Sequence, residues 1–335
     1  MGFAYDAAMN YRNVGTTDLK VSEISFGCWT MGGLNWVNGQ PNGWANVDEG
    51  EVTAAIKVGL DAGVNHWDNA DVYGNGRAEQ MLARCFASLG VRSTDQVIAT
   101  KVGHFPGTAE HAFDKLHIRH QCEQSLKNLR RDHIDIYYLH HGDFGPDNRY
   151  LPEAAETVHA LRREGKIRHI GQSAYSVADF AKTIPIVKPV VLQSWAHALD
   201  DQYIRPGSPL QKLMDEDKLS FVAFSPLAQG QLLGKYDPKR PPTFEPGDNR
   251  AGSKSFSAEN LARLEPKIAK LKTRFGNDTG DLVRVALGYV LAQPNVCCVI
   301  PGFRNDRQAR SNVGPASKPP LSAEDVKFVR EALDA

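Results

Sequence analysis

Residues 64–79, VNHWDNADVYGNGRAE, contain the pattern from which the fold can be argued. The segment starts as an apolar, strand-like run that ends at Asp68, and it continues through a glycine-rich turn into a helical pattern. A strand followed directly by a helix is the repeating part of a βαβ unit, which builds parallel sheets. Tyr73 stands in the turn, beside Gly74 and close to Gly76.

The alternation of strand and helix patterns continues along most of the chain. Continuous apolar runs suit strands that are covered on both faces, as in a parallel sheet. The strand candidates are residues 23–27, 64–68, 96–100, 134–140, 167–173, 190–195, 219–225 and 296–302. Helix candidates include residues 48–63, 78–90, 118–130, 153–166 and 280–293. This order predicts an α/β fold, a closed (β/α)₈ TIM barrel, as a single domain over residues 1–335 with a short flexible N-terminus near residues 1–10.

The remaining segments are expected at the two ends of the barrel. Residues 11–22 read as a β-hairpin, with Gly15 and Asp18 near its turn, that covers the barrel floor. Residues 31–47, 104–115 and 235–255 read as loops at the mouth.

In such barrels the chemistry lies at the carboxyl ends of the strands. Asp68 ends the second expected strand and Tyr73 follows it, Lys101 follows the third strand, and His140 ends the fourth. Three successive strands therefore direct a carboxylate, a phenol, an ammonium group and an imidazole toward one mouth.

These four groups suggest proton transfer to a carbonyl. A tyrosine has an ordinary pKa near ~10, which an adjacent ammonium group lowers. Lys101 can supply this charge, and Asp68 can keep the lysine protonated. A neutral His140 can donate a hydrogen bond to a carbonyl oxygen. Because none of the four residues can supply hydride, a nicotinamide cofactor is implied.

Composition excludes several other classes of function. The formal net charge is zero and no basic block is present, which argues against nucleic acid or an anionic membrane as a partner. No apolar run approaches the ~18 residues of a membrane span, and the N-terminus lacks a signal-peptide pattern. The five cysteines form no CxxC pair, so we expect a reducing cytoplasm and no metal site.

The motifs DNADVYG (68–74), ATK (99–101) and DIYYLH (135–140) resemble, in order and spacing, those of the aldo-keto reductase superfamily. LRREGKIRHIGQS (161–173), FSPLAQGQLLGKY (224–236) and IPGFRNDRQARSN (300–312) follow in the family's order, so the resemblance covers nearly the whole chain. The chain is also similar in part to the potassium-channel β subunits, which share these motifs. The resemblance implies that Tyr73 is the general acid of a catalytic tetrad that is completed by Asp68, Lys101 and His140.

The resemblance also implies a cofactor, NADP, with NAD as the alternative. Ser173 and Gln193 match positions that bind the carboxamide, and Phe224 matches an aromatic residue that stacks on the nicotinamide. The positions for the pyrophosphate and phosphate are Ser225, Leu227, Lys235 and Arg250, and those for the 2′-phosphate and adenine are Arg304, Gln308 and Asn312. The expected cofactor site also includes Gly27, Trp29, Gln229 and Gly302. The chain departs from the usual family residues at Ala174, Gly302, Phe303, Gln308 and Ser311.

Several aromatic residues are expected at the rim of the mouth. Trp29, Trp36 and Trp44, together with His141, are assigned to the substrate pocket, and Trp195 lies at a predicted strand end. Tryptophans at one rim suit flat or sugar-like substrates. His140 and His141 compete for one inward position because a strand alternates its faces, and His140 is preferred. His104 and Asp143 are adjacent to the predicted site.

These observations predict an enzyme that reduces an aldehyde or ketone, or oxidises an alcohol, such as a sugar or polyol, in the reverse direction. The substrate is a small molecule, and the sequence specifies no oligomeric state. Two alternatives remain. A cofactor-binding, redox-sensing partner subunit would bind nucleotide with little turnover, and a metal-dependent barrel hydrolase would need His and Asp clusters that the strand ends do not show.

Overall fold

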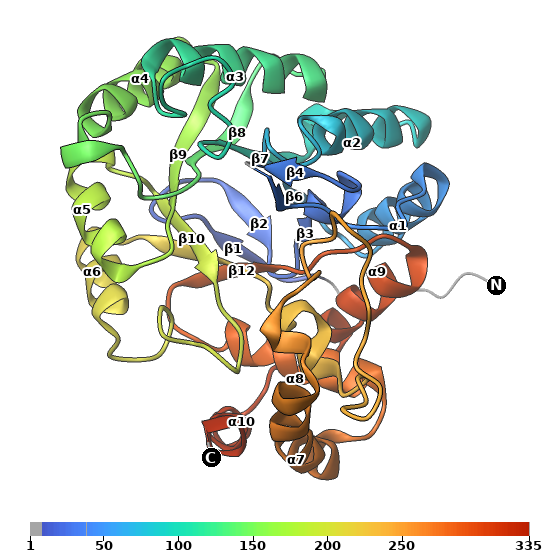
Figure 1. The fold of residues 1–335 in the computed structure, drawn as a ribbon. Helices are drawn as coiled ribbons and strands as arrows, with labels where there is room; N and C mark the ends of the chain where they lie inside the picture. Colours follow the sequence, from blue (N-terminus) through green and yellow to red (C-terminus); the bar gives the residue numbers. More distant parts are fainter. Residues whose placement is uncertain (1–8, 38, 335) are drawn as a thin grey trace.

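The computed structural model describes residues 9–37 and 39–334. Its main sheet has eight parallel strands, which follow the chain order from β3 to β12. The first and last strands meet, because Ser25 N donates to Val299 O and Gly27 N donates to Pro301 O. The sheet therefore curls into the predicted barrel, with helices around the outside (Figure 1).

Each predicted strand corresponds to one strand of the barrel, although most are shorter than predicted. Their bounds are β3 (Phe26–Gly27), β6 (His66–Asp68), β7 (Val97–Val102), β8 (Ile134–Leu139), β9 (Ile167–Ser173), β10 (Val191–Trp195), β11 (Ser220–Phe224) and β12 (Val296–Ile300). Every residue of β7 and β8 is buried, as the continuous apolar runs predicted.

The five predicted helices are present as α1 (Glu49–Asp61), α2 (Arg77–Ser88), α3 (Lys115–Leu129), α4 (Leu151–Arg163) and α8 (Thr279–Leu291). The others are α5 (Val177–Val187), α6 (Pro209–Asp217), α7 (Ala258–Phe275), α9 (Asp306–Val313) and α10 (Ala323–Asp334). Pro185 and Pro266 lie inside α5 and α7, where a proline removes a backbone hydrogen-bond donor and is unfavourable in a helix.

The α1 helix shows how local sequence fixes an element. Asp48 is its N-cap and accepts a 2.9 Å hydrogen bond from Glu51 N, and Glu49 and Glu51 lie in the first turn, where the helix dipole favours acids. Gly63, just beyond the end of the helix, has a φ of 87°, which glycine adopts at little cost. The buried face of α1 packs into the apolar layer between the strands and the outer helices.

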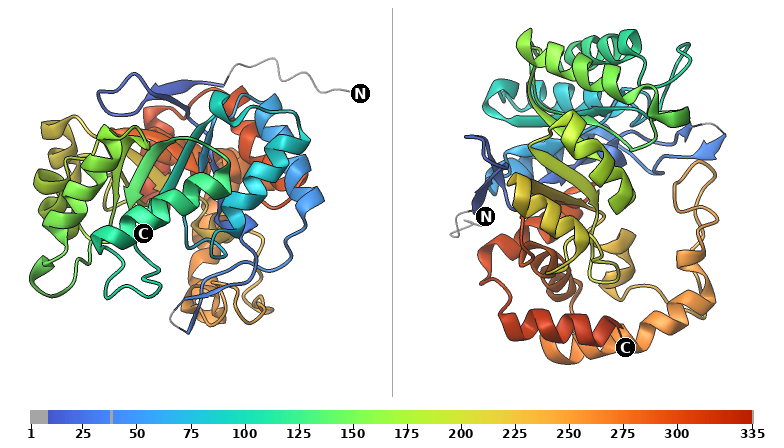
Figure 2. Two further views of the ribbon diagram at one scale, coloured as in Figure 1. Left: turned by 90° about the horizontal axis from the view of Figure 1, so that it is seen from above. Right: turned by 90° about the vertical axis from the view of Figure 1, so that its left-hand side faces the viewer.

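The two ends of the barrel differ. The predicted hairpin forms from β1 (Tyr11–Asn13) and β2 (Lys20–Ser22), and Gly15 N donates to Ser220 Oγ at the start of β11. Figure 2 shows this hairpin at one end of the barrel and the long connecting loops at the other. The mouth loop 31–47 contains a small hairpin of β4 (Trp36–Val37) and β5 (Gln40–Pro41).

The predicted flexible N-terminus falls mostly on residues 1–8, which lie outside the described residues. Met9, by contrast, is buried. Among the described residues, no helix is both long and apolar enough to cross a membrane.

Candidate active site

The turn after β6 places Tyr73 at the mouth because two loops approach closely there. Tyr73 N donates to Ala70 O, which closes the turn, and Gly74 follows with a φ of 60°. A Cβ atom on Gly74 would lie 2.2 Å from Gly32 O, so this close approach requires glycine. Gly76, with a φ of 85°, then precedes α2. The two glycines of the motif thus permit the turn that carries the tyrosine.

Lys101 connects two other members of the predicted tetrad, Asp68 and Tyr73. Its side chain is fully buried in β7, and its Nζ donates to Asp68 Oδ1 at 2.5 Å, to Asn69 O at 2.7 Å and to the Tyr73 hydroxyl at 3.2 Å. The other Asp68 oxygen accepts a 2.8 Å hydrogen bond from Gln193 Nε2. A buried charge pair of this kind requires such additional hydrogen bonds to offset its desolvation.

The Tyr73 phenol is protonated at neutral pH. Burial, and next the Asp68 carboxylate, raise the pKa of Tyr73 well above its usual value. This net direction is opposite to the lowering that we predicted from Lys101. The reason is that a buried phenolate loses its hydration, while the charge of Lys101 is offset by its contact with Asp68.

His140 is the second polar group beside Tyr73, with ring centroids 6.0 Å apart. Burial, and next the neighbouring His104, lower the pKa of His140 well below its usual value, so the imidazole is neutral. A protonated phenol and a neutral imidazole that face one space can both donate to a single carbonyl oxygen.

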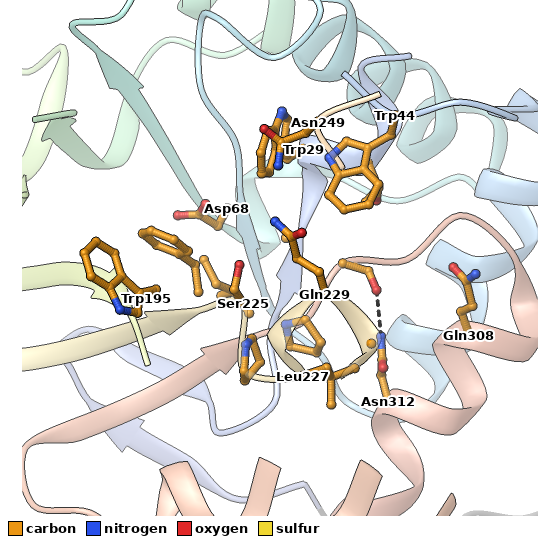
Figure 3. Close-up of a pocket in the computed structure, with 18 of the residues that line it drawn as sticks. Trp29, Trp44, Asp68, Trp195, Ser225, Leu227, Gln229, Asn249, Gln308 and Asn312 are labelled. Atoms are coloured by element: carbon orange, nitrogen blue, oxygen red, sulfur yellow. Dashed lines mark hydrogen bonds between the residues drawn. The ribbon is translucent and has the colours of Figure 1, made fainter. Parts of the chain in front are cut away.

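That space is a cavity of about 890 Å³ at the carboxyl ends of the strands. Figure 3 shows Asp68 near Trp195 on one side of the cavity, and Gln308 and Asn312 on the other. The predicted residues that line it are Gly27, Trp29, Trp44, Asp68, Tyr73, His140, Gln193, Phe224, Ser225, Leu227, Gln229, Lys235, Arg250, Gly302, Arg304, Gln308 and Asn312.

Cations gather at the side of the cavity near Gln308. Lys235 and Arg250 come from the loop 235–255 and Arg304 from the segment after β12, and the backbone N of Arg304 donates to Gln308 Oε1. Arg250 is paired with Asp248, to which it donates two 2.9 Å hydrogen bonds. Desolvation, and next Arg250, lower the pKa of Arg304, which shows that these cations crowd one another. Such a group is suited to bind an anion.

Loops 31–47 and 235–255 are joined across the mouth. Gly43 N donates to Gly247 O at 2.9 Å, and Asn249 N donates to Gly43 O at 2.8 Å. Asp248 Oδ2 also accepts from Ala45 N at 3.3 Å. These contacts position Arg250, whose guanidinium stacks on the Trp44 ring.

The structure places four predicted site residues outside the cavity wall. Lys101 lies behind Tyr73, and Ser173 is fully buried, with no hydrogen-bond partner for its Oγ among the described residues. Trp36 was expected in the substrate pocket, but its side chain is half exposed and packs against Gly247 in the other loop. His141 was also expected there, but its Nε2 donates to Gly103 O while its Nδ1 accepts from Asp143 N.

Other residues line the cavity without having been assigned to the site from the sequence. His104 and Trp195, which the sequence places near the predicted site, line the cavity, and so do Asn42, Tyr175 and Asn249, for which no role is predicted. Tyr175 follows β9, so its place after a strand end was the available signal. Asn42 accepts from the indole of Trp29.

Comparison with known proteins gives a consistent assignment. The family model described as the Aldo/keto reductase family matches residues 23–334. A probable voltage-gated potassium channel subunit beta from Arabidopsis thaliana is 28% identical over 331 residues, which cover 93% of each protein. An aldo-keto reductase from Schizosaccharomyces pombe, named for NADP(+), is 31% identical over 322 residues, covering 94% of this chain and 89% of that protein.

Among solved structures, the holo form of an aldo-keto reductase from Bacillus halodurans aligns with a TM-score of 0.75 and 26% identity. The alignment covers 97% of this chain and 96% of that one. The match to the family model spans nearly the whole barrel, including all eight strands and the cavity at their ends. The chain therefore belongs to the aldo/keto reductase family.

Proposed function

We propose that this protein uses NADPH to reduce an aldehyde or ketone to an alcohol, and that the same residues serve the reverse oxidation. The observation that carries the proposal is the contact of Lys101 Nζ with the Tyr73 hydroxyl, in a buried ion pair with Asp68, beside the neutral His140. Oxidoreduction of carbonyls and alcohols is the activity that the family supports.

In this proposal Tyr73 is the general acid. Its protonated hydroxyl donates a proton to the carbonyl oxygen as negative charge develops there, and Lys101 stabilises the phenolate that remains. His140 donates a hydrogen bond to the same oxygen and so orients the carbonyl. Asp68 has a positioning role, because it keeps the lysine charge next to the phenol.

The cavity fits a nicotinamide dinucleotide, which would supply the hydride when bound. Phe224 presents an aromatic ring at the end of β11, and Gln193 lines the same wall and could meet a carboxamide. The Ser173 hydroxyl has no partner among the described residues but is buried behind this wall, so it would reach a carboxamide only if the wall shifted. Lys235, Arg250 and Arg304 provide positive charge for phosphates at the far side. The preference for NADP rests on Arg304 and on the name of the yeast relative.

The alternative is a cofactor-binding partner subunit with little turnover, as the similarity to a probable channel subunit suggests. The test incubates the purified protein with NADPH or NADH and a panel of aldehydes and ketones, and follows nicotinamide absorbance. We expect turnover with at least one carbonyl, faster with NADPH. Tyr73→Phe is the control, because it keeps the ring and removes the proton donor. Tight cofactor binding without turnover on any carbonyl would favour the partner-subunit alternative.

A further inference from the structure

Two side chains in the cavity have no part in the proton transfer proposed above. His104 follows β7 and Tyr175 follows β9, and both line the cavity. The His104 Nε2 atom and the Tyr175 hydroxyl lie 2.9 Å apart and form a hydrogen bond. The rings of His104 and His140 are 4.4 Å apart, so this couple adjoins the imidazole that we assign to the carbonyl oxygen.

The His104–Tyr175 couple is uncharged. Burial, and next the neighbouring His141, lower the pKa of His104 to about 3. The pKa of Tyr175 is raised by desolvation of the part of its side chain that is buried, although 40% of the residue remains exposed. If the Tyr175 phenol donates to the His104 imidazole, the phenol oxygen can still accept a hydrogen bond from a ligand. If the imidazole donates, the phenol proton is available to a ligand. A hydroxyl group can match either arrangement, because it both donates and accepts.

The surroundings of the couple are aromatic. Trp195 lies nearly parallel to Tyr175, with an interplanar angle of 17° and ring centroids 6.1 Å apart. Trp29 lies similarly beside Tyr73, at 24° and 5.9 Å. Aromatic faces of this kind suit the C–H faces of a carbon chain whose hydroxyl groups point sideways.

Charge distinguishes this end of the cavity from the other. Figure 3 shows Trp195 and Gln308 on opposite sides of the cavity. Arg304, whose backbone N donates to Gln308 Oε1, is close enough to Lys235 and Arg250 for their charges to interact, so the cations gather at the Gln308 side. Near Tyr175, the buried cation Lys101 is already paired with Asp68. A carboxylate or phosphate on the substrate would therefore find no free counter-charge among the described residues at this end.

Building on the proposed reductase activity, we propose that the His104–Tyr175 couple binds a hydroxyl group carried close to the reacting carbonyl. The preferred substrates are then neutral hydroxyaldehydes and hydroxyketones, including short sugars. The corresponding products are neutral polyols.

The test compares glyceraldehyde with propanal, which has the same carbon chain without hydroxyl groups. For the parent, Tyr175→Phe and His104→Leu, kcat/KM is measured for both aldehydes. We expect the ratio of glyceraldehyde to propanal to fall about tenfold in each variant, mainly through KM, as loss of one hydrogen bond to a ligand predicts. The intrinsic reactivities of the two aldehydes cancel when the ratio is compared between enzymes.

Tyr11→Phe is the matched control, since the Tyr11 hydroxyl donates to Gly63 O on the barrel floor, and its ratio should equal that of the parent. An unchanged ratio in both cavity variants would overturn the inference while leaving the proposed function in place. So would a parent that reduces other carbonyls but neither of these aldehydes. A parent that reduces no carbonyl at all would overturn the proposed function and, with it, the inference.

Discussion

Lys101 Nζ lies 2.5 Å from Asp68 Oδ1 and 3.2 Å from the Tyr73 hydroxyl, so one buried ammonium group connects a carboxylate to a phenol. The three residues come from two neighbouring strands and the turn that follows the first of them. Asp68 and Lys101 act on the phenol in opposite directions, because a nearby anion disfavours phenolate and a nearby cation favours it. This opposition allows the role of each residue to be measured separately.

Replacement of Tyr73 by Phe removes the proposed proton donor and retains the ring that packs beside Trp29. We expect kcat for carbonyl reduction to fall by ~10²–10⁴, the usual loss when a general acid is removed. Cofactor dissociation constants, measured by fluorescence titration, should change little. Tyr11→Phe, on the barrel floor, is the control and should keep the parental rate. Near-parental kcat in the Phe variant would exclude Tyr73 as the acid.

Replacement of Lys101 by Met should raise the pKa of Tyr73 further, because the cation that stabilises phenolate is lost. Alcohol oxidation requires the phenolate as base, so its rate in the variant should reach a plateau only at higher pH than in the parent. Asp68→Asn should shift the profile in the opposite direction, because Asp68 raises the pKa of Tyr73. The measurement is the pH dependence of kcat for oxidation.

A complication of Lys101→Met is that it leaves the Asp68 carboxylate buried without its cation, which typically costs ~3–5 kcal/mol of stability. The double variant with Asp68→Asn removes both charges and serves as the folding control. Full activity with an unshifted profile in the folded single variant would contradict the role of Lys101.

The fold could be predicted from the sequence because strands that are buried on both faces consist of continuous apolar runs, as in β8. The four residues predicted as a tetrad lie close together because strand ends in a barrel share one mouth. Trp36 and His141 were misplaced because sequence position indicates which loop a side chain is in but not which way it points. His141 turns to Gly103 O, and Trp36 packs on the opposite loop. Tyr175 was missed because its place shortly after the end of β9 was its only signal.

The protonation states of His104 and His140, the two imidazoles beside the cavity, determine how kcat/KM for reduction changes below pH 7. Burial lowers the pKa of His104 to about 3 and lowers that of His140 well below 6.5, so both stay neutral as pH falls through the usual histidine range. We expect kcat/KM for reduction to show no loss between pH 7 and pH 5. As a control for unfolding, samples are exposed to the lower pH, returned to pH 7 and then assayed. A single-proton limb near pH 6.5 that disappears in His140→Asn would contradict the neutral state of His140.

Phe224 is predicted to contribute to cofactor affinity, because it ends β11 and lines the cavity. Phe224→Ala should weaken binding of either cofactor by about 1–3 kcal/mol, as truncation of a well-packed aromatic contact does. Phe105→Ala is a matched control, since Phe105 is exposed and does not line the cavity. Equal dissociation constants for parent and Phe224→Ala in a fluorescence titration would exclude the stacking role.

Arg304 is the residue on which the preference for NADP depends most. It follows β12 and precedes α9, and its guanidinium donates to Ala45 O rather than to an acid. Its charge is therefore available to a phosphate, whereas Arg250 is already paired with Asp248.

We expect Arg304→Ala to raise KM for NADPH by about ten- to one-hundredfold, because a hydrogen bond to a charged group contributes roughly 1.5–3 kcal/mol. KM for NADH should remain nearly constant, since NADH lacks the 2′-phosphate. Arg310→Ala is the control, because Arg310 lies in the last turn of α9, pairs with Asp306 and is outside the cavity wall. An equal rise in KM for both cofactors would mean that Arg304 supports the loop through its bond to Ala45 O. A parent enzyme with a higher kcat/KM for NADH than for NADPH would overturn the preference for NADP itself.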